Sequence, residues 1–313
     1  MASVKNYLSL IKFSHTIFAM PFALIGFALG VLTKTPFATV DAFLNSHSTT
    51  PGWRTTLYSH GYWELVRLFV LVILCMITAR SAAMAFNRYL DRQFDAKNPR
   101  TAGREIPAGI ISEKNALFFT IVMCVLFIAC TFFINSICFY LSPVALFVIL
   151  FYSYTKRFTF LCHLVLGLGL SLAPIGAYLA VTGQFSLLPI LFSITVICWV
   201  SGFDIIYALQ DEAFDKDNNL YSIPSVAGKP KALHISELLH VISAAAVIGA
   251  GFCGYFGILY WAGAAVFCGM LIYQHSVVKA DDLRRVNLAF MTANGIASVV
   301  FAVFVLADIF LKY

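Results

Sequence analysis

Apolar runs of roughly 20 residues recur along this chain, and an α-helix needs a run of that length to cross a hydrocarbon core of ~30 Å. Of the 313 residues, 60% are hydrophobic and only 12% are charged, about half the charged share of an ordinary soluble domain. These features exclude a soluble globular protein. They predict an all-α integral membrane protein, folded as a single polytopic domain over residues 1–313, whose surroundings are a lipid bilayer and not a nucleic acid.

Nine apolar segments are predicted to be transmembrane helices around a central cavity. They cover residues 11–33, 65–86, 115–134, 137–154, 160–181, 187–209, 234–256, 258–277 and 287–311. The connections between them alternate in character, as expected of a bundle of helical hairpins. Short turns interleave with four polar, basic connections, which are residues 87–114, 155–159, 210–233 and 278–286.

Lysine and arginine are shared unequally between the two sides that this topology defines. With the N-terminus in the cytoplasm, the cytoplasmic side carries 16 basic residues and the opposite side carries three. The positive-inside rule therefore predicts a cytoplasmic N-terminus. Residues 34–63 form the one long outer loop, for which we expect a solvated connection and not a lid. The first 15 residues are too short and too poor in Arg and Ser for a transit peptide, which favours a bacterial inner membrane.

Acidic residues are concentrated at two cytoplasmic helix ends. The first group is Asn87, Asp91 and Asp95, called here the first row. Residues spaced by four lie on one face of a helix, so these polar side chains stack and the two carboxylates repel each other. An arrangement with this cost requires an explanation.

The second group repeats the arrangement about 120 positions later. Asp204, Asp211 and Asp215 form the second row, with spacings of seven and four that again predict one helix face, and Tyr207 lies among them. The two clusters hold seven of the chain's 15 acidic residues, which are Asp91, Asp95, Asp204, Asp211, Glu212, Asp215 and Asp217. The repeated offset suggests an internal duplication of a four-helix unit.

Two rows of carboxylates in a membrane protein imply a cation, because each embedded carboxylate costs at least a few kcal/mol. Hard oxygen ligands point to Mg²⁺, which is commonly bound by one or two carboxylates together with phosphate oxygens. We predict that each row holds one Mg²⁺ and that the two ions share a diphosphate. The predicted metal ligands are Asn87, Asp91, Asp95, Asp204, Asp211 and Asp215. The predicted catalytic residues are the acids of the two four-residue repeats, which are Asp91, Asp95, Asp211 and Asp215.

Basic residues near both rows are predicted to balance phosphate oxygens, with arginine supplying forked donors. The predicted substrate-binding residues are Arg88, Arg92, Arg100, Arg104, Lys156, Tyr207, Lys216 and Lys229. The alternative is that these acids and bases form ordinary juxtamembrane salt bridges on a solvated face. The matched offset from Asp91 to Asp211 and from Asp95 to Asp215 argues against that alternative.

The two rows resemble the signatures N-x-x-x-D-x-x-x-D and D-x-x-x-D of the UbiA superfamily of intramembrane aromatic prenyltransferases. Residues 100–109 resemble the family's R-T-x-x-R-x-x-P-x-G segment, and residues 154–157 resemble its basic fourth-to-fifth connection. The resemblance spans most of the chain. It implies nine transmembrane helices around a cavity, two Mg²⁺ ions carrying an isoprenyl diphosphate, and transfer of the prenyl group to an aromatic ring.

Within the superfamily, residues 87–92 and 221–224 resemble the 4-hydroxybenzoate polyprenyltransferases of quinone biosynthesis, including the menaquinone-related branch. The likeness implies a polyprenyl donor, an aromatic acid acceptor and release of diphosphate in ubiquinone or menaquinone biosynthesis. The chain departs from many members at Arg88, where they carry an acid. Arg80 and Lys156 are candidates for holding the acceptor carboxylate, whereas a lone histidine such as His163 is expected to be a core residue.

Four alternatives remain at the level of the sequence. The acceptor can be 1,4-dihydroxy-6-naphthoate in menaquinone biosynthesis, or a tetrapyrrole, as in haem and chlorophyll prenylating enzymes. A secondary transporter would place buried acids near the bilayer midplane, whereas the acids here sit at the predicted cytoplasmic ends. A structural or interaction protein leaves both rows unexplained.

Overall fold

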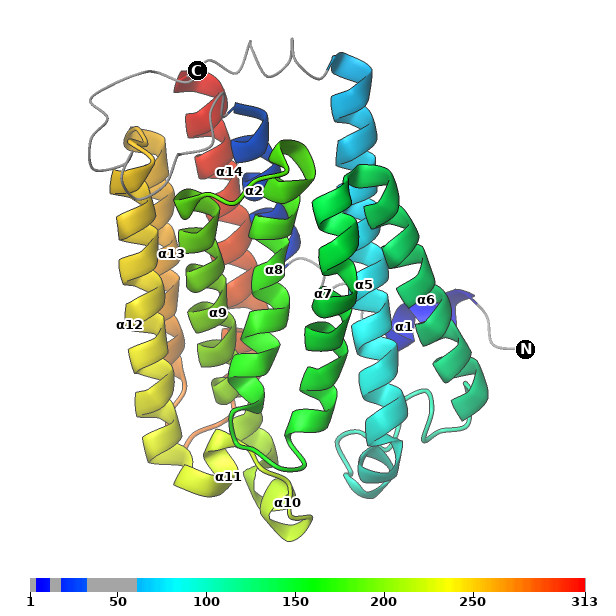
Figure 1. Ribbon diagram of the computed structural model, residues 1–313. Helices are drawn as coiled ribbons and strands as arrows, with labels where there is room; N and C mark the ends of the chain where they lie inside the picture. The colour runs from blue at the N-terminus through cyan, green and yellow to red at the C-terminus, as the bar shows by residue number, and fades with distance from the viewer. Residues whose placement is uncertain (1–3, 12–17, 33–60, 313) are drawn as a thin grey trace.

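The computed structural model describes residues 4–11, 18–32 and 61–312, and within these ranges the chain is helical without a β-strand. Figure 1 shows most of the helices running side by side in one bundle. The elements are α1 (Val4–Leu10), α2 (Met20–Leu32), α5 (Tyr62–Lys97), α6 (Glu113–Ile134), α7 (Ser136–Thr155), α8 (Cys162–Thr182), α9 (Leu187–Ala208), η2 (Leu209–Asp211), α10 (Glu212–Asp217), α11 (Ile223–Ala227), α12 (Lys229–Cys253), α13 (Ile258–Val277), η3 (Leu288–Ala293) and α14 (Asn294–Lys312).

Eight helical segments in the described part of the chain are long and apolar enough to cross a membrane. They correspond to the second through ninth predicted spans, and α13 has the predicted bounds. The first predicted span, residues 11–33, is described only as the 13-residue helix α2, because residues 12–17 and 33 lie outside the described ranges. The predicted outer loop, residues 34–63, also lies almost entirely outside them. The count of nine helices therefore stays a prediction.

Helix α5 is much longer than the predicted span 65–86. It runs for 36 residues, from Tyr62 to Lys97, and so carries the whole first row on its last three turns. An apolar run marks only the part of a helix suited to a hydrocarbon core. The four-residue spacing of the row continues the same helix into the polar end of the bundle.

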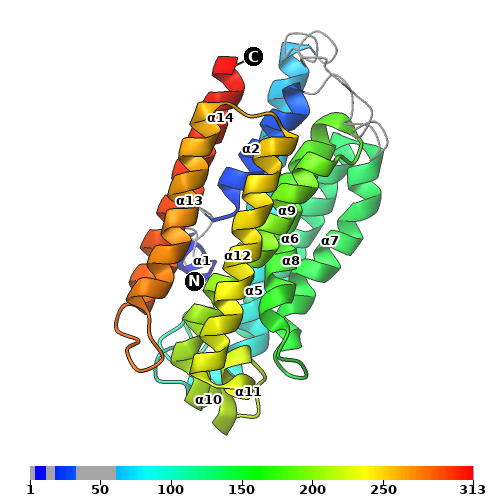
Figure 2. The same cartoon turned by 90° about the vertical axis from the view of Figure 1, so that its left-hand side faces the viewer.

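The packed centre of the bundle lies among α2, α9, α12, α13 and α14. Its largest side chains are aromatic, and Trp199 of α9 packs against Phe22 of α2 and Phe267 of α13 with ring centroids 5.5 and 5.7 Å apart. Helices α5, α6 and α7 form the other wall, and α8 lies between α2, α7 and α9 (Figures 1 and 2). This division leaves room for a cavity between the two walls.

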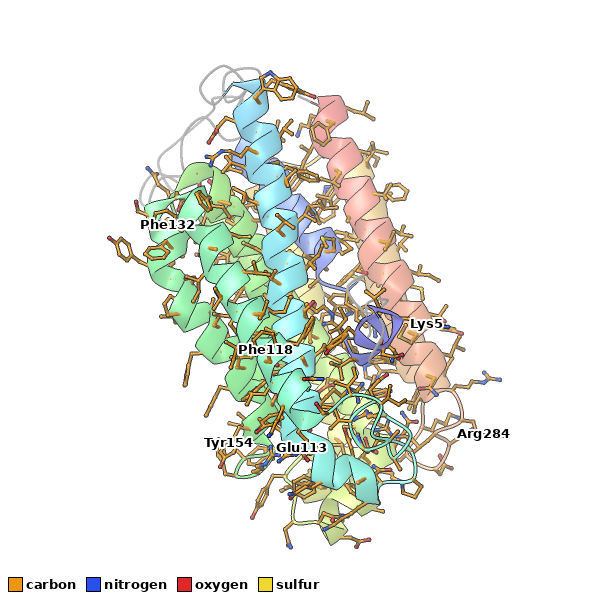
Figure 3. The ribbon with its side chains drawn as sticks, turned by 90° about the vertical axis from the view of Figure 1, so that its right-hand side faces the viewer. Lys5, Glu113, Phe118, Phe132, Tyr154 and Arg284 are labelled. Atoms are coloured by element: carbon orange, nitrogen blue, oxygen red, sulfur yellow. The ribbon has the colours of Figure 1, made fainter. Side chains whose placement is uncertain are left out.

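The four basic connections gather at one end of the bundle. In Figures 1 and 2 the connections after α5, α7, α10 and α13 all lie at the lower end, while α14 ends at the opposite end. Figure 3 places Glu113, Tyr154 and Arg284 towards this same lower end. The predicted grouping of the basic connections on one side is thus confirmed, whereas the side of the membrane they face stays a prediction.

Large apolar side chains cover the outside of α6 and α7, as lipid contact requires. Phe118 and Phe132 of α6 are 68% and 61% exposed, and Figure 3 shows Phe132 pointing away from the bundle. Only four of the 22 residues of α6 are buried. The helix therefore contributes more surface than core.

Close approach between α2 and α8 depends on Gly26. A Cβ atom built at Gly26 would lie 2.9 Å from the Cα of Pro174 and closer still to its carbonyl group, so no side chain fits there. Small residues at such contacts let membrane helices pack tightly.

We expect the Gly26→Ala variant to be destabilised by about 1–3 kcal/mol, the usual cost of overpacking a well-packed contact. The measurement is thermal unfolding in detergent. Gly249→Ala on α12 is the matched control, because a Cβ there meets nothing within 4 Å. Equal melting temperatures for the two variants would show that α2 and α8 separate more easily than their packing indicates.

Candidate active site

A cavity of about 1260 Å³ lies between α5, α7, α8 and α9. Both His163 and Leu179 of α8 line it, and 16 residues of helix span about 24 Å, so the cavity follows most of the length of α8. Its walls are apolar over much of that length. The polar side chains of both rows line its other part, near the basic end of the bundle.

The first row lines this cavity from the last turns of α5. Asp91 is 3% exposed and contacts two cations of the α7–α8 connection: Lys156 Nζ lies 2.6 Å from its Oδ2, and Arg157 Nη2 donates to its Oδ1 at 3.0 Å. Asn87 Nδ2 donates to the same carboxylate at 3.3 Å. Asp95 accepts from Arg104 Nη1 at 2.7 Å through Oδ1. The four-residue spacing thus brings the row to one wall, as predicted.

The second row does not lie on one uninterrupted α-helix, although the predicted face assumed regular helical spacing. Helix α9 ends at Ala208, and a 3₁₀ turn, Leu209–Asp211, separates it from α10. A 3₁₀ turn advances three residues per turn and changes the face that follows. Asp204, Asp211 and Asp215 nevertheless all line the cavity, together with Tyr207.

Arg100 connects the segment after α5 to the second row. It lies in the connection after α5 and forms an ion pair with Asp211, donating from Nε to Oδ1 at 3.0 Å, and it donates from Nη1 to the Tyr207 hydroxyl at 2.9 Å. Asn98 Nδ2 also donates to Asp211 Oδ1, at 3.3 Å. Burial disfavours the charged guanidinium of Arg100. The negative charge of Asp211 and the hydrogen bonds from Arg100 to Asp211 and Tyr207 outweigh this effect, so the pKa of Arg100 is raised above its ordinary value.

The predicted substrate-binding residues fall into two groups. Arg88, Arg100, Arg104, Lys156 and Tyr207 line the cavity. The remaining three contact acidic side chains that do not line it. Arg92 Nε lies 2.9 Å from Glu113 Oε2, while Lys216 Nζ and Lys229 Nζ lie 2.6 and 3.6 Å from the carboxylate of Glu212. Many acids and bases therefore do pair, as the salt-bridge alternative expects, but the pairs of the two rows face a cavity instead of a solvated surface.

Buried polar atoms near Asp95 lack partners among the described residues. Asp95 Oδ2 has no hydrogen bond, and neither do Nε and Nη1 of Arg88, which is 4% exposed. Arg88 Nη1 is 4.0 Å from Asp95 Oδ2, too far for a hydrogen bond. A cation on the carboxylate and an anion on the guanidinium would satisfy both groups at once.

The donor set suits magnesium bound together with a phosphate compound. Among the described residues, no three His, Cys, Asp or Glu side chains converge closely enough to form a complete metal site by themselves. Mg²⁺ does not need such a cage, because it is usually bound through one or two carboxylates, water and substrate phosphates. The oxygen ligands of both rows, including Asp95 Oδ2, which has no hydrogen bond to any described residue, therefore fit this ion.

Three residues of the site were not among the predicted ones. Arg157 pairs with Asp91, Ser222 Oγ donates to Asp215 Oδ2 at 2.8 Å, and His163 Nδ1 lies 2.7 Å from Asp204 Oδ2. The position of Arg157 beside Lys156 was a usable signal. Nothing in the local sequence indicates the partner of His163, because Asp204 is 41 residues away, whereas Ser222 is only seven residues from Asp215 and follows the turn after α10.

Comparison with known proteins identifies the family to which this cavity and its two carboxylate rows belong. The family described as the UbiA prenyltransferase family matches residues 48–296. The chain belongs to this family. It is a multi-pass membrane enzyme, an aromatic polyprenyltransferase of the UbiA family, as the resemblance of the two rows predicted.

Individual relatives of the UbiA family agree with this assignment. A 4-hydroxybenzoate octaprenyltransferase of Aliivibrio fischeri (strain MJ11) is 30% identical over 252 residues, which are 80% of this chain and 86% of that protein. A 4-hydroxybenzoate octaprenyltransferase of Tolumonas auensis is 29% identical over 258 residues, which are 82% of this chain and 88% of that protein. The matches cover nearly the whole length of these relatives.

Solved structures of UbiA homologues share the fold. The apo structure of a homologue from Aeropyrum pernix K1 has a TM-score of 0.72 at 27% identity, with 95% of this chain and 98% of that chain covered. A homologue from Archaeoglobus fulgidus, bound to DMAPP and Mg²⁺, has a TM-score of 0.71 at 21% identity, with 98% and 99% covered. The bundle described above is thus the UbiA fold.

Proposed function

We propose that this UbiA enzyme transfers a polyprenyl group from an isoprenyl diphosphate to an aromatic ring acid of the 4-hydroxybenzoate type, with Mg²⁺ and with release of diphosphate. The observation that carries the proposal is the pair of buried groups at Arg88 and Asp95 whose atoms lack hydrogen bonds to the described residues, inside a cavity lined by two carboxylate rows. A metal diphosphate supplies the cation and the anion that these groups lack. The names of the octaprenyltransferase relatives support the choice of donor and acceptor.

The two rows would hold the metal ions through Asn87, Asp91, Asp95, Asp204, Asp211 and Asp215. When bound, Mg²⁺ neutralises the charge that develops on the diphosphate as the allylic C–O bond breaks. The Archaeoglobus fulgidus homologue, which binds DMAPP with Mg²⁺, supports this use of the site.

Basic side chains that now pair with the rows would turn to the phosphates when the donor binds. Arg100, Arg104 and Lys156 each hold a carboxylate of Asp211, Asp95 or Asp91. With Mg²⁺ held by these carboxylates, the three basic side chains would be able to donate to phosphate oxygens, and two donors of Arg88 have no hydrogen-bond partner among the described residues. The rows and their counterions thereby exchange partners instead of leaving charges buried alone.

The apolar length of the cavity suits the prenyl chain. It extends along α8 away from the rows, past Gly169 and Ala173 to Leu179. These walls exclude water, so that the allylic cation left by C–O cleavage reacts with the ring and not with solvent. Aromatic side chains, among them Phe290 and Tyr152, also line the cavity, and a ring face turned towards the cation would stabilise it. The ring's π electrons form the new C–C bond, and loss of the ring proton restores aromaticity.

Arg80 is the better of the two candidates for holding the acceptor carboxylate. It lies on α5 about two turns before Asn87, lines the cavity, and its buried Nε has no hydrogen-bond partner among the described residues. Lys156 is already 2.6 Å from Asp91. A planar guanidinium also matches a carboxylate through two parallel hydrogen bonds.

For the whole protein we propose nine transmembrane helices with a cytoplasmic N-terminus, in a bacterial inner membrane, within ubiquinone or menaquinone biosynthesis. The second candidate acceptor is 1,4-dihydroxy-6-naphthoate, which also carries a carboxylate for Arg80. The resemblance of residues 87–92 and 221–224 to the menaquinone-related branch favours it as the alternative.

The test is prenyl transfer by purified protein in detergent, with a long-chain isoprenyl diphosphate and Mg²⁺, against the two ring acids in parallel and against phenol. We expect product with one of the ring acids and little with phenol, because phenol lacks the carboxylate. Product with phenol at an equal rate would contradict the acceptor assignment. In sealed proteoliposomes, ion-coupled flux of the donor without any prenylated product would support the secondary transporter instead.

A further inference from the structure

His163 lies between two polar partners at the wall of the cavity. It is 3% exposed, in the first turn of α8, with Nδ1 2.7 Å from Asp204 Oδ2. On the other side of the ring, the backbone N–H of Ile223 donates to Nε2 at 3.3 Å. Because a backbone N–H can only donate, Nε2 is the unprotonated nitrogen, so Nδ1 carries the proton and donates to Asp204.

The contact between α8 and α9 fixes the position of the imidazole. Ser201 Oγ, one turn before Asp204 on α9, donates to the carbonyl oxygen of His163 at 3.0 Å. One turn further along α8, a Cβ at Gly167 would lie 2.5 Å from the carbonyl oxygen of Ile197, so the two helices touch there through their backbones. His163 therefore has little freedom to move away from Asp204.

The segment that His163 holds through Ile223 supports other parts of the site. Ser222 Oγ donates to Asp215 Oδ2 at 2.8 Å, and the backbone N–H of Tyr221 donates to the carbonyl oxygen of Lys156 at 2.7 Å. Lys156 in turn lies beside Asp91. One imidazole thus contacts Asp204 directly and is linked to Asp215 through two consecutive residues, Ile223 and Ser222.

Resting on the proposed function, we propose that His163 is a positioning residue of the metal–diphosphate site. Its Nδ1–H orients the Asp204 carboxylate, and its Nε2 anchors residues 221–223, which place Ser222 against Asp215. His163 itself touches neither metal nor substrate in this role. Hydrogen-bonding partners behind metal ligands change metal affinity by about 10–100-fold when they are removed.

The test measures Mn²⁺ binding by electron paramagnetic resonance, in the presence of farnesyl thiolodiphosphate, a donor analogue that does not react. The protein is the full chain in detergent, as wild type and as the variants His163→Phe and His163→Asn. The amide N–H of asparagine can replace the Nδ1–H of the histidine, whereas phenylalanine cannot. His240→Asn is the control, because His240 is equally buried, on α12, and does not line the cavity.

We expect His163→Phe to raise the Mn²⁺ dissociation constant about 10–100-fold, His163→Asn to recover most of that loss, and His240→Asn to change nothing. An unchanged dissociation constant in His163→Phe would overturn the inference and leave the proposed function standing. Equal losses in both His163 variants, in step with their melting temperatures, would show a merely structural role and also overturn it. Failure of the wild type to bind Mn²⁺ with the analogue would overturn the proposed function, and the inference with it.

Discussion

Replacing Asp91 or Asp211 with alanine is expected to lower kcat about 10³-fold or more. Metal ions supply several kcal/mol of charge stabilisation in a transition state, and each 1.36 kcal/mol corresponds to a factor of ten in rate. Each substitution removes a carboxylate from one of the two rows that line the cavity. The measurement is the rate of diphosphate release at saturating donor and Mg²⁺.

Loss of folding is a competing explanation for a dead variant, since Asp91 is buried beside Lys156 and Arg157. The isosteric Asp91→Asn variant keeps the shape of the side chain and is expected to be nearly as inactive, with a melting temperature closer to that of the wild type. Glu64→Ala is the matched control, because it removes a carboxylate from an ion pair with Arg67 on the same helix, near its other end. Turnover near that of the wild type in Asp91→Ala or Asp211→Ala would refute the two-metal assignment.

The Arg80→Ala variant is expected to raise the KM for the aromatic acid about 100-fold, with a small change in the KM for the prenyl donor. Truncating one partner of a buried, hydrogen-bonded charge pair costs about 2–5 kcal/mol. The buried Nε of Arg80 has no hydrogen-bond partner in the described part of the chain, and the side chain lines the cavity two turns before the first row. Steady-state kinetics, with each substrate varied in turn, measures the two KM values separately.

Two comparisons separate a carboxylate contact from a general disturbance of the cavity. Arg80→Lys is expected to recover part of the affinity, because it keeps the charge but not the forked donors. Phenol, which has no carboxylate, is expected to react equally poorly with the wild type and with Arg80→Ala. A uniform loss of turnover with an unchanged acceptor KM would place the acceptor carboxylate elsewhere.

Local spacing was sufficient to predict the parts of the fold that depend on one helix. The apolar run at 258–277 became α13 with the same bounds, and the four-residue spacing placed Asn87, Asp91 and Asp95 on one wall of the cavity. Both follow from the period of an α-helix. After Ala208 a 3₁₀ turn interrupts the α-helical period, and Asp211 still lines the cavity, where Asn98 and Arg100 donate to its carboxylate.

Ion pairs between side chains far apart in the sequence could not be predicted from one sequence. Arg100 and Asp211 are 111 residues apart and His163 and Asp204 are 41 apart, and nothing local to either residue specifies its partner. By contrast, the four-residue spacing of Glu212 and Lys216 predicts their ion pair. This spacing indicates that Lys216 pairs with Glu212 and not with a phosphate, contrary to its predicted role in substrate binding.

The central claim is that the two rows bind an isoprenyl diphosphate together with Mg²⁺. The most direct measurement is the dissociation constant of farnesyl thiolodiphosphate, determined by isothermal titration calorimetry on the wild-type protein with Mg²⁺ and again with EDTA. We predict tight binding with Mg²⁺ and a loss of at least about 100-fold in affinity with EDTA, because the rows then repel the diphosphate and keep their own counterions. Equal affinity under both conditions would contradict the account.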